Sequence, residues 1–155
     1  MKLIGKPTIN PIFYYSGKFS GYGLWVLLII PLCSKDNITH PNLQTTASWI
    51  FLCIGLIFTF ASLANLGKST RLGIPREDTQ LKTHGFYKIS RNPMYVGFNM
   101  FSISAILFFN TLVILILGFY SIMIYHFIIL GEERFLENRF GEKYLIYKKR
   151  VRRYL

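Results

Sequence analysis

The stretch from Thr111 to Leu130, TLVILILGFYSIMIYHFIIL, is twenty residues long and carries no charged side chain. A second stretch of the same length, Ala47 to Leu66, ASWIFLCIGLIFTFASLANL, is also uncharged. An α-helix rises about 1.5 Å per residue, so each stretch reaches about 30 Å, the thickness of a bilayer's hydrocarbon core. Both stretches therefore predict membrane-spanning helices.

Two shorter uncharged stretches, Ser20 to Ser34 and Met94 to Asn110, add two further candidate spans. The whole chain of 155 residues is 52% hydrophobic, which is more apolar surface than a small soluble domain can hide. We therefore expect an all-α, multi-pass membrane protein with about four transmembrane helices, built as a single domain over residues 1–155.

The net charge of +11 is distributed unevenly along the chain. Basic residues gather before the first span, between the second and third, and after the fourth. Only Lys35 lies between spans one and two, and no charge lies between spans three and four. This alternation places both termini in the cytoplasm and provides attraction to anionic lipid, so nucleic acid is not an expected partner. The short chain without an organelle address favours a bacterial inner membrane over the endoplasmic reticulum.

Spans three and four meet at Asn110–Thr111 with almost no loop, which predicts a tight antiparallel hairpin. Pro93 fits the first helical position of span three, with Asn92 extended before it. The hairpin would bring the start of span three to the same membrane face as the end of span four.

Beyond Leu130, apolar and aromatic residues recur at helical spacing, with basic residues on the other face. The recurring positions are Leu136, Phe140, Tyr144, Tyr147, Val151 and Tyr154. They predict a cytosolic, amphipathic C-terminal helix along the membrane surface, with Gly141 as a break between two pieces.

Polar side chains also line the spans at helical spacing. They are Tyr95, Asn99 and Ser102 in span three, and Thr59, Ser62 and Asn65 in span two. For the serines and threonine, hydrogen bonds between helices are the favoured interpretation, whereas the asparagines stay open to a functional role.

Glu132 and Glu133 stand where span four leaves the membrane, and His126 lies seven residues before Glu133, on the same helical face. A carboxylate pair there is either a solvated group beside Arg134 or a holder of a cationic ligand. His126 is equally compatible with helix packing and with function. The two cysteines, Cys33 and Cys53, lie in or beside apolar spans and predict no metal site.

The stretch His84 to Gly97, HGFYKISRNPMYVG, resembles the signature of the isoprenylcysteine carboxyl methyltransferase family, whose prokaryotic members also resemble phospholipid N-methyltransferases. Glu132–Leu136, EERFL, then Phe140–Tyr144, FGEKY, and Tyr147 are similar to that family's acidic pair and aromatic C-terminal helix. The resemblance covers residues 66–155 and includes both halves of the signature.

This resemblance implies a fold in which helices and cytosolic segments surround S-adenosylmethionine, whose ammonium and sulfonium groups are cationic. The residues implied to contact it are His84, Tyr87, Asn92, Tyr95, His126, Glu132 and Glu133. Arg91 and Glu133 are the expected catalytic residues, and no metal is expected. The acceptor would be hydrophobic or lipid-like, either an isoprenylcysteine-type carboxylate or a phospholipid amine, and would enter laterally from the bilayer.

The sequence leaves several alternatives. Eukaryotic prenylcysteine enzymes usually have Arg-His-Pro where this chain has Arg91-Asn92-Pro93, and their catalytic Arg and Glu align here with His126 and Leu130, which favours another acceptor. A nicotinamide-dependent membrane reductase of related helical fold would need a longer, more basic C-terminal region. A proton-coupled transporter would need an acidic residue within a span, and a non-catalytic scaffold is a further alternative. The oligomeric state and the choice of catalytic residue among His126, Arg91 and Glu133 stay open.

Overall fold

The computed structural model describes residues 7, 9–33, 42–66 and 80–155, and every regular element in these residues is a helix. The elements are α1 (Pro11–Cys33), α2 (Leu43–Leu66), the 3-10 turn η3 (Gly85–Lys88), α3 (Pro93–Phe109), α4 (Leu112–Phe140) and α5 (Glu142–Arg150). The all-α expectation is confirmed over the described part of the chain.

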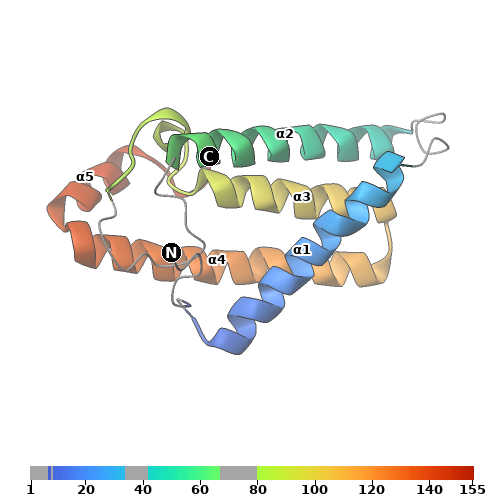
Figure 1. The fold of residues 1–155 in the computed structure, drawn as a ribbon, viewed down its shortest axis with the longest axis horizontal. Helices are drawn as coiled ribbons and strands as arrows, with labels where there is room; N and C mark the ends of the chain where they lie inside the picture. The colour runs from blue at the N-terminus through green and yellow to red at the C-terminus, as the bar shows by residue number, and fades with distance from the viewer. Residues whose placement is uncertain (1–6, 8, 34–41, 67–79) are drawn as a thin grey trace.

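The bundle is assembled around α3 and α4. Helix α2 lies alongside α3, while α1 crosses α4 obliquely and also contacts α3 (Figure 1). The buried core between α1, α3 and α4 is strongly aromatic. It contains Tyr14, Tyr95, Phe98, Phe101, Ile124, Tyr125, Ile128 and Ile129.

Two helices, α2 and α4, are long and apolar enough to cross a bilayer. Helix α3 is apolar but has 17 residues, and at about 1.5 Å per residue it is shorter than a typical span. Helix α1 starts at Pro11, nine residues before the expected first span, because Pro11 is a suitable first helical residue and the side chain of Asn10 accepts the Ile12 N–H at 3.0 Å. The count of four spans stays a prediction.

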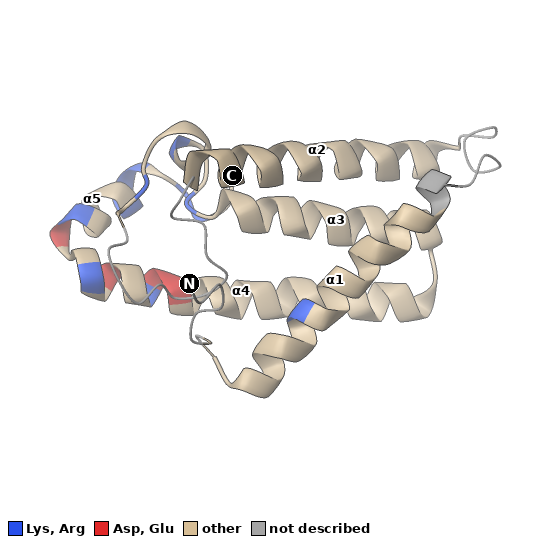
Figure 2. Ribbon diagram, viewed as in Figure 1, with Lys and Arg blue, Asp and Glu red and all other residues tan. Residues whose placement is uncertain are grey.

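The outer surface matches a lipid environment along most of the bundle. On α4, large apolar side chains such as Leu112, Phe119 and Phe127 are exposed. Beyond Leu130 the exposed residues of the same helix become charged, as Arg134 and Arg139 show. Figure 2 shows the charged residues gathered at the end of the bundle that carries α5, apart from one basic position on α1.

Small residues let α2 and α3 approach closely. A Cβ added at Gly97 would collide with Thr59 and with the carbonyl of Gly55. Nearby, Ser48 and Ser104 each donate a hydrogen bond to the other's backbone carbonyl at 2.9 Å. Such small-residue contacts and serine bonds hold helices together where lipid provides no hydrophobic drive.

Hydrogen bonds between helices were predicted for the serines of α2 and α3, and they are confirmed for the serine of α3 only. Ser102 of α3 contacts Ser121 of α4 at 3.0 Å, as expected for a bond between helices. Ser62 instead donates to the carbonyl of Phe58 in its own helix, so the expectation was wrong there. A hydroxyl four residues after a carbonyl on one helix can always form this local bond, which sequence spacing does not exclude.

The tight hairpin between α3 and α4 is confirmed. Asn110 ends α3 in the left-handed conformation, with φ of 45°, and Thr111 caps α4 by accepting the N–H of Ile114 at 3.4 Å. Asparagine tolerates that conformation better than most residues, and threonine is a favourable N-cap. The turn places the start of α3 beside the charged end of α4.

The C-terminal region differs in part from expectation. Helix α4 continues past Leu130 to Phe140, and Gly141, with φ of 51°, separates it from α5 as predicted. The helix pattern extended to Tyr154, but α5 ends at Arg150 and Val151 is already extended. The reason is tertiary: the N–H of Arg91 donates to the carbonyl of Arg152 at 2.9 Å, pulling the last residues against the start of α3.

Candidate active site

Glu133 is the centre of a buried network at the charged end of the bundle. Its carboxylate accepts from Arg91 Nε at 3.1 Å and Nη2 at 3.0 Å, and from Asn92 Nδ2 at 3.0 Å. Arg153 donates to the other oxygen through Nε at 3.1 Å and Nη2 at 3.0 Å. A carboxylate has about four lone-pair positions, so the protein itself saturates this one. Glu133 thereby joins the start of α3, the end of α4 and the C-terminal residues.

Arg91 is equally saturated. Besides Glu133, its Nη1 donates to the carbonyls of Lys148 at 3.0 Å and Val151 at 3.3 Å. The Lys148 carbonyl belongs to the last turn of α5 and the Val151 carbonyl to its C-cap residue, where helical partners are missing. These hydrogen bonds involve all three nitrogens of the guanidinium. Arg91 therefore caps α5, and every nitrogen of its side chain already donates to a protein oxygen in this conformation.

The electrostatics of Glu133 follow from this network. Glu133 lies beyond the uncharged part of α4, which ends at Leu130. Burial alone would raise the pKa of its carboxyl. The hydrogen bonds from Arg153 and Asn92 and the charge of Arg91 outweigh burial and hold the pKa below its ordinary value. Glu133 is thus a stable anion inside the protein.

Glu132 has different surroundings, although it is the adjacent residue. Successive helical residues point about 100° apart, so Glu132 faces α1 and α3. Its one hydrogen bond among the described residues comes from the hydroxyl of Tyr95, at 2.8 Å. On the α1 side, buried Lys18 donates to the hydroxyl of Tyr14 at 2.6 Å. This network of Tyr14, Lys18, Tyr95 and Glu132 is called the α1 cluster below.

The carboxyl of Glu132 is less completely paired than that of Glu133. Burial raises its pKa above the ordinary value, and the hydrogen bond from Tyr95 and the charge of Lys18 only partly oppose this. A half-buried carboxylate with spare acceptor capacity attracts cations more strongly than one already held by two arginines. Of the acidic pair, Glu132 is therefore the better candidate to hold a cationic ligand.

The His84–Tyr87 segment is held by close packing against α2. Gly85 has φ of 60°, and an added Cβ would collide with the side chain of Asn65, so only glycine fits this turn. Phe86 packs edge-on against Phe58 with ring centroids 5.2 Å apart. His84 precedes the turn and is exposed.

Tyr147 of α5 fixes the same segment from the other side, by donating to the carbonyl of Tyr87 at 2.6 Å. Burial raises the pKa of the Tyr147 hydroxyl to about 12, so the donor keeps its proton at all physiological pH values.

An apolar hollow of about 470 Å³ lies between α3, α4 and the last two residues. Apolar side chains dominate its lining: Val96, Met100, Ile103, Ile122, Met123 and Leu155. Its polar residues are Asn99, His126 and Tyr154, and His126 Nδ1 lies 2.6 Å from the Tyr154 hydroxyl. The buried Oδ1 of Asn99 has no hydrogen-bond partner within the described part of the chain. A hollow of this kind suits an apolar chain with a polar end.

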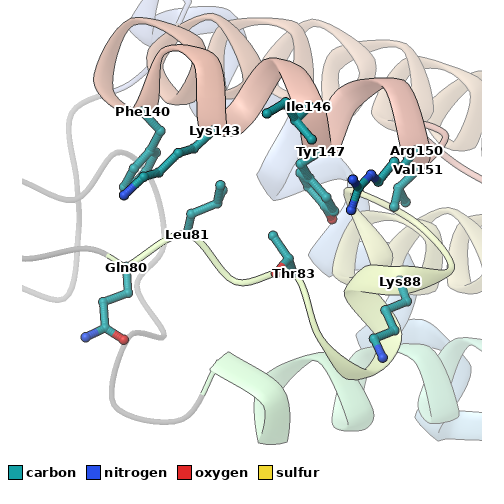
Figure 3. A pocket seen from close by; sticks show the side chains of 10 residues that line it. All are labelled: Gln80, Leu81, Thr83, Lys88, Phe140, Lys143, Ile146, Tyr147, Arg150 and Val151. Carbon is teal, nitrogen blue, oxygen red and sulfur yellow. The ribbon is translucent and has the colours of Figure 1, made fainter.

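A larger cavity of about 820 Å³ separates residues 80–88 from α5 (Figure 3). Its apolar lining consists of Leu81, Phe140, Ile146 and Val151, and its polar lining of Gln80, Thr83, Lys88, Lys143, Tyr147 and Arg150. The cavity is thus lined by both apolar side chains and three cations.

The structure brings together Arg91, Asn92 and Glu133 directly, and Tyr95 with Glu132, at one end of the bundle. His84 stands apart and exposed, Tyr87 takes part through its backbone, and His126 faces the apolar hollow. Of the predicted contact residues, only His126 lines either hollow described above. Their roles stay predictions.

Three residues of the site were missed from sequence: Lys18, Arg153 and Tyr154. Lys18 had a usable signal, since a lone charge on an otherwise apolar helix is costly without a partner. Arg153 and Tyr154 had none, because nothing local distinguishes Arg153 from the neighbouring basic residues, or sets Tyr154 apart from the other tyrosines. Within the described residues, no group of three or more His, Cys, Asp or Glu side chains is placed to hold a metal ion.

Comparisons with known proteins relate the chain to methyltransferases. A family model described as phospholipid methyltransferase matches residues 43–143. A Protein-S-isoprenylcysteine O-methyltransferase from Schizosaccharomyces pombe is 29% identical over 121 residues, covering 74% of this chain and 50% of that protein. The chain therefore spans about half the length of this curated relative. No solved structure matches.

Proposed function

The chain belongs to the phospholipid methyltransferase family, and we propose that it transfers a methyl group from S-adenosylmethionine to a lipid-like acceptor at the membrane. The main support for this proposal is that the start of α3 and the end of α4, both within the matched region, come together at the charged end of the bundle. Glu133 and Glu132 of α4 accept the hydrogen bonds that join the two segments. The family match also favours methyl transfer over the nicotinamide-dependent reductase and scaffold alternatives.

The α1 cluster fits the methyl donor by its chemistry. S-adenosylmethionine supplies an electrophilic methyl on a sulfonium, and its amino-acid end carries an ammonium. Glu132 offers a half-buried carboxylate with one hydrogen bond, from Tyr95, beside the aromatic core. Tyrosine rings and carboxylates both attract cations. We propose that Glu132 and Tyr95 hold the cationic part of the donor, with Glu133 and Arg91 fixing the frame around them.

Methyl transfer is an in-line displacement, so the acceptor atom must lie about 3 Å from the methyl carbon along the line of attack. A carboxylate acceptor arrives ionised and needs no base. An amine acceptor must lose a proton, and His126 lines the apolar hollow with an imidazole that can accept one. His126 is thus a proposed base for an amine, while Arg91, all three of whose side-chain nitrogens already donate to protein oxygens, is a proposed structural residue.

The apolar hollow is the proposed place for the acceptor's hydrocarbon chain. It lies between α3 and α4, and exposed Met123 is part of its wall. A lipid could enter it sideways from the bilayer. The same proposal treats residues 1–155 as one domain with about four spans, with both termini cytoplasmic, in a bacterial inner membrane.

Binding of the methyl donor tests the proposal most directly. Isothermal calorimetry on detergent-purified protein would measure S-adenosylmethionine and its demethylated product, with Glu132→Gln as the variant. Glu137→Gln is the matched control, since Glu137 lies on the same helix and pairs with Lys148 in a partly exposed ion pair.

We expect the parent and the control to bind both compounds, and Glu132→Gln to lose at least tenfold in affinity at unchanged thermal stability. Folded parent protein that binds neither compound would overturn the proposed function. If the parent binds the donor, incubation with methyl-labelled donor and fractionated lipids would identify the acceptor by transfer of the label.

A further inference from the structure

We propose that the cavity between residues 80–88 and α5 binds the headgroup of an anionic phospholipid from the surrounding bilayer. The occupant is a resident lipid rather than the methyl acceptor, so this site is separate from the one proposed above. It depends on the charged end of the bundle lying at the membrane surface, and does not depend on methyl transfer.

The first argument is the composition of the cavity. Lys88, Lys143 and Arg150 line it, and no acidic side chain is among its described lining residues. The labelled side chains in Figure 3 show Lys143 and Arg150 on α5 and Lys88 across the cavity on η3. Cations on two separate elements offer an anion in the cavity charge-assisted hydrogen bonds from more than one direction.

The second argument is that these cations are not neutralised by the protein. Within the described residues, ion pairs join Arg91 and Arg153 to Glu133, and Lys148 to Glu137. Glu132 accepts a hydrogen bond from Tyr95, and neither it nor Glu142 of α5 is among the described residues that line the cavity. The three cations that line the cavity take part in none of these ion pairs. Their field is available to an external anion.

The third argument is that the two walls are already joined. The Tyr147 hydroxyl donates to the carbonyl of Tyr87 at 2.6 Å, Arg91 donates to two carbonyls at the end of α5, and Ser90 donates to the carbonyl of Arg153 at 3.0 Å. A ligand would therefore meet a formed cavity and would not need to order its walls, which lowers the entropy cost of binding.

The fourth argument is the position of the cavity and its apolar lining residues. Its lining includes Lys88, five residues before α3 begins at Pro93, and residues of α5, the helix at the charged end of the bundle (Figure 2). Ile146, which lines the cavity, is exposed, as are Ile89 and Leu145, the chain neighbours of Lys88 and Ile146. Apolar side chains beside cations match the two parts of a phospholipid, whose acyl chains begin where its phosphate ends. A soluble anion would not require the apolar part.

The test is a competition between lipids on the full chain. Purified protein in mixed micelles of phosphatidylglycerol and phosphatidylcholine would be analysed by native mass spectrometry for retained lipid. The cavity variant is Lys143→Gln with Arg150→Gln. The control is Lys149→Gln with Arg152→Gln, which removes the same charge from exposed neighbouring residues that do not line the cavity. Circular dichroism confirms that both variants stay helical.

We expect the parent to prefer phosphatidylglycerol, and the cavity variant to lose about 25-fold of that preference, at about fivefold for each cation removed near a headgroup. The control should lose only a few fold. Equal losses in the two variants would mean a general surface field and would overturn the proposal. So would equal retention of both lipids by the parent, or full displacement of phosphatidylglycerol by millimolar glycerol phosphate, which has the phosphate without the acyl chains.

Discussion

Replacing Glu133 with glutamine removes the charge at the centre of the network that joins α3, α4 and the C-terminal residues. The Arg91 side chain is only 8% exposed, so it would remain as a buried cation without its counter-ion. Removing one partner of a buried ion pair costs about 3–5 kcal/mol. Arg153 is 32% exposed and can recover hydration, so its share of the loss is small. We therefore expect Glu133→Gln to lower the free energy of unfolding by about 3 kcal/mol.

The assay is thermal unfolding in detergent, followed by intrinsic fluorescence. At about 2–4 °C per kcal/mol for a chain of this size, the midpoint should fall by about 6–12 °C. Glu137→Gln is the control: its partner Lys148 is 37% exposed, and such pairs contribute less than about 1 kcal/mol. The double variant Arg91→Gln, Glu133→Gln should be less destabilised than the sum of its parts, because the buried cation leaves with the anion.

Equal midpoints for Glu133→Gln and Glu137→Gln would refute the assignment of Glu133 as a structural centre. The outcome also separates the two adjacent glutamates. If Glu133 is structural, the Glu133→Gln variant should lose binding of the methyl donor only to the extent that the protein unfolds. If Glu132 holds the ligand, the Glu132→Gln variant should lose donor binding while its unfolding midpoint stays unchanged.

Three further predictions follow from the same contacts. The pKa of Glu133 is lower in the folded protein than its ordinary carboxyl value of 4.5, so this group stabilises the fold fully above pH 4.5. The stabilisation is lost as the pH falls through the lower folded pKa. Acid should therefore lower the unfolding midpoint of the parent more than that of Glu133→Gln. Lys18→Met removes the charge that partly opposes the raised pKa of Glu132, so the pH below which S-adenosylmethionine binding fails should move upward in calorimetry; an unchanged pH profile would separate Lys18 from the site. Gly97→Val should cost about 1–3 kcal/mol by overpacking α3 against α2. Gly23→Ala, whose added Cβ meets no atom within 4 Å, should instead raise the unfolding midpoint slightly, because Ala is favoured over Gly inside a helix by about 0.5–1 kcal/mol.

The helices and their order were accessible from local sequence. An uncharged stretch of twenty residues predicts α2, and another predicts the apolar part of α4, because the bilayer penalises charge wherever it lies. Asn110–Thr111 predicted the hairpin, since so short a junction leaves only an antiparallel neighbour, and Pro93 and Gly141 predicted boundaries through their backbone preferences. These features depend on a few adjacent residues, so no knowledge of packing was required.

The division of roles within the site was decided only by tertiary structure. Glu132 and Glu133 are identical and adjacent, and the sequence could say only that they face different directions. The structure shows that Glu133 contacts Arg91 and Arg153, whereas Glu132 faces Tyr95 and Lys18. This assignment depends on how α1 crosses α4 and on how the last residues return to the start of α3. Periodicity gives the faces of one helix but not the partner of each face, because that partner is set by contacts between residues far apart in the chain.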